Sequence, residues 1–161
     1  MLESALGFRA LRQMHDTCVR EPFDAVAISG RALDYVGVEA EFSEVDFDKL
    51  RSINGPLILA ANHPFGGIEF LALVALMEKI RPGQWKFLAN DLLCSIQGFE
   101  EKFIPLDPLA RRPEARRRNR HGLKRAMEHL RGGGLLGLFP AGRVSYAAPE
   151  LGGVVVDSNW S

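Results

Sequence analysis

The chain has 161 residues, 47% of them hydrophobic and 25% charged, and its twenty Lys and Arg balance its twenty Asp and Glu. Such a composition is typical of one globular domain, and zero net charge provides no general field for nucleic acid. The N-terminus lacks the pattern of a secretory signal, and no apolar run approaches the roughly 18 residues of a membrane span. The two cysteines, Cys18 and Cys94, have no metal-ligand spacing and fit a reducing compartment. We therefore expect a cytoplasmic protein, soluble or peripheral on a membrane.

The N-terminal part predicts two helices, separated by Pro22. Residues 8–20 carry an apolar stripe at helical spacing, which faces the core or, alternatively, lies on a membrane surface. Its members are Leu11, Met14 and Cys18. Residues 23–35 form the second predicted helix. We expect residues 1–35 to be a helical segment within one domain overall.

From residue 36 onward, stretches typical of strands alternate with stretches typical of helices. Strands are predicted at residues 36–45, 57–61, 85–89, 102–106 and 135–139, and a last apolar run lies at residues 152–156. Helices are predicted at residues 46–50, 68–80, 92–96 and 114–131. This alternation predicts an α/β domain over residues 36–161, with a mainly parallel sheet and helices on both of its faces.

Two features are expected within these elements. Pro105 cannot donate a hydrogen bond to a neighbouring strand, so the strand at residues 102–106 should lie near an edge of the sheet. In the helix at residues 114–131, a buried stripe is expected at helical spacing. It consists of Leu123, Met127 and Leu130.

A histidine and a glutamate lie where the predicted strand at residues 57–61 passes into a helix. The connection reads Asn62-His63-Pro64-Phe65-Gly66-Gly67-Ile68-Glu69, and its proline and glycines predict a tight, exposed turn. Ligands and catalytic groups collect at such strand ends in α/β proteins. His63 could act there as a general base, with the carboxylate of Glu69 orienting its ring. In a simpler interpretation, Glu69 only complements the helix N-terminus and His63 is an ordinary surface residue.

A second loop follows the predicted strand at residues 135–139 and should open at the same edge of the sheet. It reads Phe139-Pro140-Ala141-Gly142-Arg143-Val144-Ser145. Its Gly142-Arg143 pair offers close backbone approach and a cation to an anionic group. The residues of the two loops therefore predict acid–base chemistry on an anionic substrate.

Other motifs indicate no alternative chemistry. The run Gly132-Gly133-Gly134-Leu135-Leu136-Gly137 has the dinucleotide-binding spacing, but it follows a helix and precedes a strand, the reverse of what that motif requires. No serine lies in a nucleophile-elbow motif. His121 and His129 share one helix, where a solvated face is a better interpretation than a metal site.

Basic residues gather in one segment, since eight of the twenty Lys and Arg lie in residues 111–125. The segment includes Arg116, Arg117, Arg118 and Arg120. It is either a solvated helix face or a dock for an acidic carrier protein, the phosphates of coenzyme A or anionic lipid head groups.

The two loops resemble motifs of the glycerolipid and lysophospholipid acyltransferase family, the PlsC-like enzymes. The first loop is similar to the family motif N-H-x-x-x-x-D, and the second is similar to F-P-E-G-T-R-S. Between them, residues 98–107, with Phe103-Ile104, are similar to a G-x-x-F-I-x-R segment. The chain most resembles the hemolysin-like branch, which includes ornithine-lipid acyltransferases and has the motifs N-H-P-x-G-G-x-D/E and F-P-A-G. The resemblance covers roughly residues 30–148, in the same order and spacing.

This resemblance implies an enzyme that transfers a fatty acyl group from a thioester to the hydroxyl of a lysolipid. His63 would be the general base, and Glu69 would hold it. From their position at the N-terminus of a predicted helix, we further expect that backbone N–H groups around Gly66 and Gly67 could stabilise the oxyanion. The implied substrate-binding residues are Asn62, Gly66, Gly67, Phe139, Pro140, Gly142, Arg143 and Ser145. The implied carrier or membrane contacts are Arg116, Arg117, Arg118 and Arg120.

The same resemblance implies the partners of the protein. They are a lysolipid acceptor, an acyl carrier protein or coenzyme A thioester as co-substrate, and an anionic membrane surface. The protein would then be cytoplasmic and peripheral on the inner membrane face. No bound cofactor, metal or nucleic acid is expected.

The chain also departs from the family pattern. Five residues rather than four separate His63 from the acid, Ala141 replaces a motif Glu, and Leu106-Asp107 stand where the second motif has its basic residue. These changes favour an acceptor without the glycerol phosphate that the family grips there. A fourth motif, an apolar strand with Val-Pro, is absent from the sequence, so we expect an incomplete domain with an open strand edge. The alternative function is a truncated, inactive relative that binds lipid or a protein partner.

Overall fold

Four parallel strands form the central sheet of the computed structural model, which describes residues 13, 16–42, 47–107, 110, 112–148 and 154–157. In spatial order they are β1 (Leu57–Ala60), β4 (Leu135–Leu138), β2 (Trp85–Asn90) and β3 (Phe103–Leu106). The α/β class and the parallel sheet expected from the sequence are confirmed. Pro105 lies in an edge strand, as predicted, and β1 forms the other edge, where Ile58 is 62% exposed.

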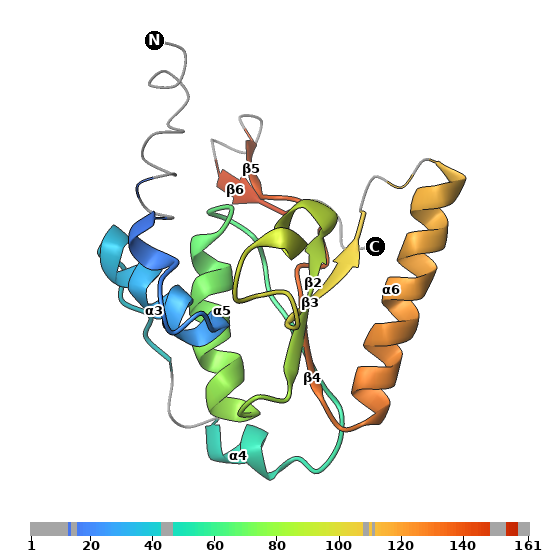
Figure 1. The fold of residues 1–161 in the computed structure, drawn as a ribbon, viewed down its shortest axis with the longest axis horizontal. Helices are drawn as coiled ribbons and strands as arrows, with labels where there is room; N and C mark the ends of the chain where they lie inside the picture. Colours follow the sequence, from blue (N-terminus) through green and yellow to red (C-terminus); the bar gives the residue numbers. More distant parts are fainter. Residues whose placement is uncertain are drawn as a thin grey trace.

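The strands are aligned so that their carboxyl ends meet at one edge of the sheet. Ala60 of β1 pairs with Leu138 of β4, and Asn90 of β2 pairs with Leu106 of β3. In Figure 1 this carboxyl edge points upward, and the loops that leave it lie below β5 (Tyr146–Ala148). Segments that are distant in the sequence therefore come together there.

Helices cover both faces of the sheet (Figure 1). α5 (Ile68–Ile80) and α3 (Ala25–Val36) lie on one face, and α6 (Pro113–Arg131) lies on the other. α5 is apolar around most of its circumference because it is packed between the sheet and α3. Asp24 caps the N-terminus of α3, where its carboxylate accepts hydrogen bonds from two backbone N–H groups of the first turn, and Gly37 caps the C-terminus with a left-handed φ of 69°.

Shorter elements complete the chain. α4 (Phe47–Ser52) precedes β1, and a 3-10 helix, η2 (Asp91–Ser95), follows β2 in place of the predicted α-helix at residues 92–96. β5 pairs with β6 (Val154–Val156) in an antiparallel hairpin that is separate from the main sheet.

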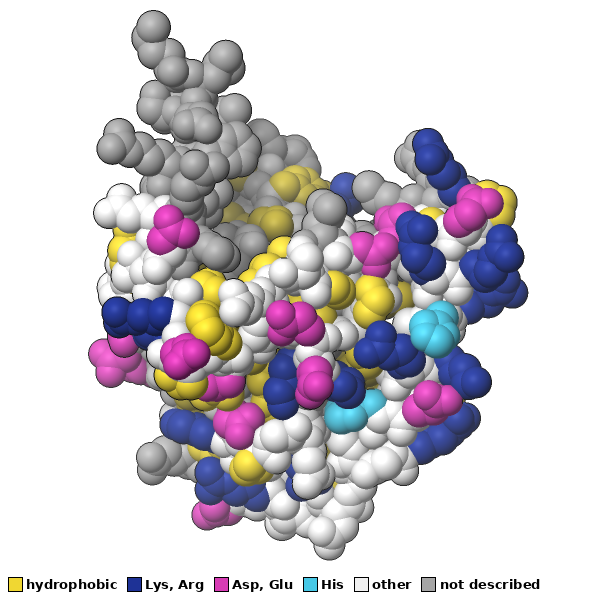
Figure 2. Space-filling model, viewed as in Figure 1, with side chains coloured by type: hydrophobic (Ala, Val, Ile, Leu, Met, Phe, Trp, Pro, Cys, Tyr) yellow, Lys and Arg dark blue, Asp and Glu magenta, His cyan; other side chains and the backbone are white. Residues whose placement is uncertain are grey.

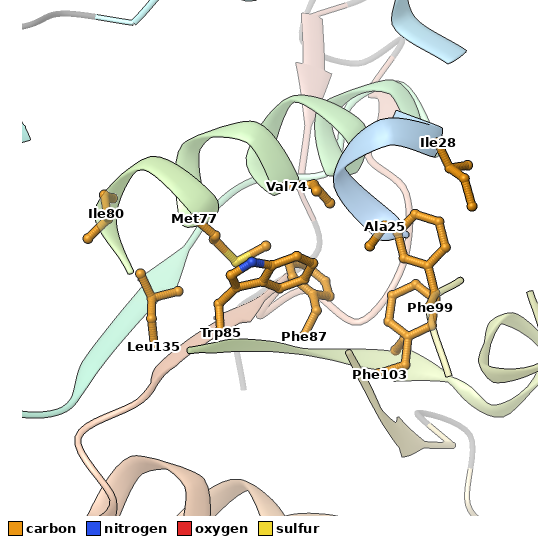
Figure 3. Close-up of a cluster of buried hydrophobic side chains, with 11 residues drawn as sticks. Ala25, Ile28, Val74, Met77, Ile80, Trp85, Phe87, Phe99, Phe103 and Leu135 are labelled. Carbon is orange, nitrogen blue, oxygen red and sulfur yellow. The ribbon is translucent and has the colours of Figure 1, made fainter. Parts of the chain in front are cut away.

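The main core lies between the sheet and α5 (Figure 3). Trp85 and Phe87 of β2 point to this side and pack below Val74 and Met77 of α5, both fully buried. Burial of each such side chain stabilises the fold by about 1.5–3 kcal/mol. Lys86 and Leu88 alternate with the buried residues of β2 and lie on the α6 side.

The N-terminal predictions are only partly covered by the described residues. The predicted helix at residues 8–20 lies mostly outside them, although residues 16–18 are helical and Cys18 is buried. The helix predicted at residues 23–35 is confirmed as α3, with bounds shifted by at most two residues. Across the described part of the chain, the helices are all too short or too polar to cross a membrane.

The predicted strand at residues 36–45 is wrong in its described part. Val36 ends α3, and residues 37–42 pair with no described strand. The apolar residues of this stretch are nevertheless partly buried and its glutamates are exposed. Phe42 packs edge-to-face on Phe47 of α4 and beneath the ammonium group of Lys79 on α5. The alternation therefore reflects burial of one side against helices, whereas a strand also needs an open strand edge beside it.

The predicted buried stripe of α6 is wrong at two of its three positions. Leu123 and Met127 are 48% and 52% exposed, whereas Leu130 is partly buried and the closest contacts are made by small residues such as Gly122. A Cβ on Gly122 would lie only 2.4 Å from the carbonyl oxygen of Pro105, so α6 packs directly on the backbone of β3. The prediction failed because it followed the large apolar residues and not the small ones that permit close packing.

Candidate active site

Two loops meet at the carboxyl edge because the strands before them are neighbours. Ala60 pairs with Leu138, and the N–H of Ala61 donates to the Leu138 carbonyl oxygen at 3.2 Å. His63 lies two residues beyond this hydrogen bond, and Phe139 directly follows Leu138. The sheet thus brings together the two motifs that the sequence singled out.

His63 and Glu69 form the central pair of the site. His63 Nδ1 is hydrogen bonded to Glu69 Oε1, and the two side chains are only 16% and 14% exposed. An ionised carboxylate can only accept, so Nδ1 carries the proton in this pair. In the neutral ring, Nε2 then has the lone pair and faces away from Glu69, as a general base requires.

Glu69 is held by the backbone as well as by His63. The N–H groups of Phe65 and Gly66 both donate to Glu69 Oε1 at 3.2 Å. Burial acts to raise the pKa of Glu69, but hydrogen bonds from its own backbone, His63 and Phe65 outweigh it and hold this pKa below its ordinary value. Glu69 also lies in the first turn of α5, where a negative charge is favourable. Both interpretations of Glu69 from the sequence therefore describe real contacts.

Phe139 covers one face of the His63 ring. The two rings are stacked, with 4.0 Å between centroids and 10° between planes. Phe139 in turn contacts Phe87 at 5.1 Å between centroids, and Phe87 contacts Phe70 at 4.9 Å. Phe70 follows Glu69 on α5, so these aromatic contacts connect both members of the central pair to the core. The sequence placed Phe139 among the substrate-binding residues, whereas the structure places it against the imidazole ring of His63.

Ser145 ties the second loop to the first. Its N–H donates to the His63 carbonyl oxygen at 2.8 Å, and its hydroxyl donates to Asp157 Oδ1. Asp157 follows β6, so the hydroxyl also fixes the loop to the β5–β6 hairpin. Val144 packs over Gly66 in the first loop, where a Cβ would lie 3.6 Å from Val144 Cγ2. The two loops and the hairpin therefore form one connected unit.

Glycines shape both loops. Gly66 and Gly142 have φ angles of 82° and 65°, which residues with a side chain rarely adopt. The Gly142 N–H donates to the Phe139 carbonyl oxygen at 3.0 Å and closes a turn around Pro140. Of the two glycines expected to bind an oxyanion, Gly66 already donates its N–H to Glu69, and Gly67 is the N-cap of α5.

Asn62 and Arg143 complete the expected set. Both are exposed, one in each loop. Glu69 Oε2, in contrast, is buried and has no hydrogen-bond partner among the described residues. The site therefore combines a partly buried His–carboxylate pair with polar groups that solvent can reach.

The arginines expected to contact a carrier or a membrane are exposed on the first half of α6. This end of α6 lies at the carboxyl edge, since Asn119 exchanges two hydrogen bonds of 2.8 Å with the backbone of Asp107, just after β3. Figure 2 shows basic side chains gathered over α6, interspersed with acidic ones. Arg118 pairs with Asp91 at 3.4 Å. Because successive helix residues are turned by about 100°, the arginines point in several directions and form no single face.

A separate groove of about 420 Å³ lies at the opposite, amino edge of the sheet. Lys86, Lys102 and His129 are among its lining residues, and His63 and Glu69 are not. The groove is thus distinct from the site at the carboxyl edge. Separately, among the described residues, no three His, Cys, Asp or Glu side chains gather in the manner of a metal site.

Sequence reasoning missed Asp157 and the stacking of Phe139. A large aromatic residue directly after a buried strand could have indicated Phe139, because it must lie beside the loop of the neighbouring strand. Asp157 gives no comparable signal, since only the β5–β6 hairpin returns it to Ser145.

Comparison with known proteins agrees with this geometry. The sequence profile of the acyltransferase family matches residues 42–153, a range that contains both loops. The chain is also similar to the lyso-glycine lipid O-acyltransferase of Phocaeicola vulgatus, with 30% identity over 79 residues. That match covers 47% of this chain and 28% of the relative.

Proposed function

Because this chain belongs to the acyltransferase family, we propose that it moves a fatty acyl group from an acyl thioester to the hydroxyl of a lyso-lipid. The observation that carries the proposal is the hydrogen bond between His63 Nδ1 and Glu69 Oε1, which leaves Nε2 available to a substrate. A His–carboxylate pair serves many reactions, and the family restricts the reaction to acyl transfer.

In the proposed reaction, His63 Nε2 takes the proton of the acceptor hydroxyl as that oxygen attacks the thioester carbonyl carbon. The new C–O bond gives a tetrahedral intermediate, and its collapse breaks the C–S bond. The departing thiolate receives the proton from His63, so the ring ends neutral. Glu69, whose pKa is held low, stays ionised and stabilises the imidazolium between the two steps.

We propose an acceptor whose head group lacks glycerol phosphate. Leu106 and Ala141 supply no charge at positions where the similar motifs carry charged residues. The similar protein of Phocaeicola vulgatus is named for a lyso-glycine lipid, although this chain matches only 28% of its length. A lyso-amino-acid lipid is therefore the proposed acceptor, and its carboxylate would suit the exposed Arg143 of the second loop.

The proposed donor is a thioester of coenzyme A or of acyl carrier protein. The arginines at the start of α6 would attract the phosphates of coenzyme A, the acidic acyl carrier protein, or an anionic membrane surface on the cytoplasmic side. Reversing Arg116, Arg117 and Arg118 to Glu should weaken binding to acyl carrier protein or to anionic vesicles, and high salt should remove the difference. Arg131→Glu, at the exposed far end of α6, is the matched control. Unchanged binding at low salt would make the cluster a plain solvated surface.

The function is tested by incubating the purified chain with a lyso-glycine lipid and either acyl coenzyme A or acyl carrier protein thioester. Mass spectrometry should detect the O-acylated lipid, and less product should form when lysophosphatidate replaces the acceptor. A folded chain that forms no acylated lipid with either donor would contradict the proposed function.

A further inference from the structure

Exposed apolar side chains lie in and beside the loop that carries His63. Phe65, in the first loop, is 74% exposed, the highest fraction among the large apolar side chains that the structure describes. Val144 of the second loop and Tyr146 of β5 are 43% and 49% exposed. Single exposed apolar residues are ordinary, but several around one site mark a contact surface.

These side chains lie together because the segments that carry them are bonded to each other. The Ser145 N–H donates to the His63 carbonyl oxygen at 2.8 Å, which places residues 144–146 beside the first loop. Val144 packs over Gly66, the residue that follows Phe65. We call Phe65, Val144 and Tyr146 the apolar rim.

Arg143 adds a positive charge directly beside the apolar rim. Arg143 lies between Gly142 and Val144, and it is exposed. The exposed arginines of α6 lie at the same carboxyl edge of the sheet, as the contacts of Asn119 with Asp107 establish. Aromatic and aliphatic side chains next to Arg are typical of protein surfaces that enter the head-group region of an anionic membrane.

We infer that the apolar rim inserts into the surface of an anionic lipid bilayer and holds His63 at the level of the lipid head groups. The inference rests on the proposed function for the identity of the substrate, but the membrane contact does not require turnover. The hydroxyl of a lysolipid would then reach His63 Nε2 without leaving the bilayer surface. Phe65 is the main anchor because its side chain is the most exposed of the three.

Co-sedimentation with vesicles tests the membrane contact. Vesicles of phosphatidylcholine and phosphatidylglycerol should bind the Phe65→Ser variant about tenfold more weakly than the parent, since an inserted Phe loses its burial. Tyr146→Ser should weaken binding by a smaller factor. Ile53→Ser is the matched control, because Ile53 is 39% exposed and precedes β1 at the amino edge. This control should bind like the parent.

A second measurement locates Phe65 directly. The emission of the Phe65→Trp variant should shift to shorter wavelength when vesicles are added, and brominated lipids should quench it. The Ile53→Trp variant should show neither effect. This readout retains an aromatic side chain, so it serves even if Phe65→Ser impairs folding.

Three outcomes have distinct meanings. If Phe65→Ser has the circular dichroism of the parent and binds vesicles equally well, and the Phe65→Trp emission is not quenched, the inference is overturned. If vesicle binding is unchanged but the variant alters only the preference for acyl-chain length, the rim is an acyl-chain subsite and the inference is again overturned. If vesicle binding depends on Phe65 while the parent forms no acylated lipid, the rim stands and the proposed function fails.

Discussion

The imidazole of His63 and the phenyl ring of Phe139 are stacked, with 4.0 Å between their centroids. Glu69 holds the edge of the same imidazole through Nδ1, and Phe139 covers its face. The two contacts come from different elements, since Glu69 lies on α5 and Phe139 follows β4. Together they fix the plane of the ring and the direction of Nε2, which a general base needs in order to meet its substrate.

Phe139→Leu tests the role of the stack. Leucine fills much of the same volume but cannot fix the plane of the His63 ring, so we expect kcat to fall about tenfold while KM changes little. Phe139→Tyr keeps the ring and is the control. Steady-state kinetics together with thermal unfolding would separate positioning from stability. Parent-like kcat in a folded Phe139→Leu variant would show that the stack does not position His63.

Glu69→Gln should reduce both turnover and stability, and its effect on stability should depend on pH. The pKa of Glu69 is lowered in the folded protein, so its ionised form stabilises the fold above the ordinary Glu pKa. This contribution is lost as the pH falls through the folded pKa. We therefore expect the variant to be less stable than the parent by about 1–2 kcal/mol at neutral pH.

The difference in unfolding free energy between the Glu69→Gln variant and the parent should shrink when both are unfolded at increasingly acid pH. Denaturant titrations at neutral and acid pH measure it. A stability difference that stays constant across this range would show that the charge of Glu69 does not stabilise the fold.

Two neighbouring substitutions on α6 test its packing. Gly122→Ala should cost about 1–3 kcal/mol of unfolding free energy, because the new methyl group would meet the Pro105 carbonyl oxygen. Leu123→Ala should cost less than about 1 kcal/mol, since its side chain is half exposed. Chemical denaturation of both variants gives the comparison. The opposite order would restore the buried stripe that the sequence predicted.

Ser145→Ala tests the link between the site and the β5–β6 hairpin. The change removes the hydrogen bond to Asp157 but keeps the backbone hydrogen bond to His63. We therefore expect an unfolding free energy about 1 kcal/mol lower than that of the parent, and a several-fold lower kcat. Asp157→Asn retains an acceptor for the hydroxyl and should behave more like the parent. If Ser145→Ala alters neither rate nor stability, the hydroxyl has no bracing role.

The sheet and the first loop could be predicted because their signals are local. The apolar run before Asn62, the turn residues Pro64 and Gly66, and the apolar stretch after Gly67 each specify a backbone state from the sequence alone. The position of His63 at a strand end follows from these signals.

Features that depend on three-dimensional neighbours could not be predicted in this way. Residues 37–42 alternate like a strand, but they pack against helices. The close approach of Gly122 to β3 depends on the absence of a side chain, which periodicity does not register. The stack of Phe139 on His63 depends on the pairing of β1 with β4, two strands that are distant in the sequence.

The central claim is that His63 acts as the general base of acyl transfer. Its most direct test is the rate of acylated-lipid formation by the parent and by His63→Ala, measured on preparations with the same circular dichroism. The account predicts a loss of at least about a hundredfold, as expected when a general base is removed. Equal rates for the folded variant and the parent would contradict it.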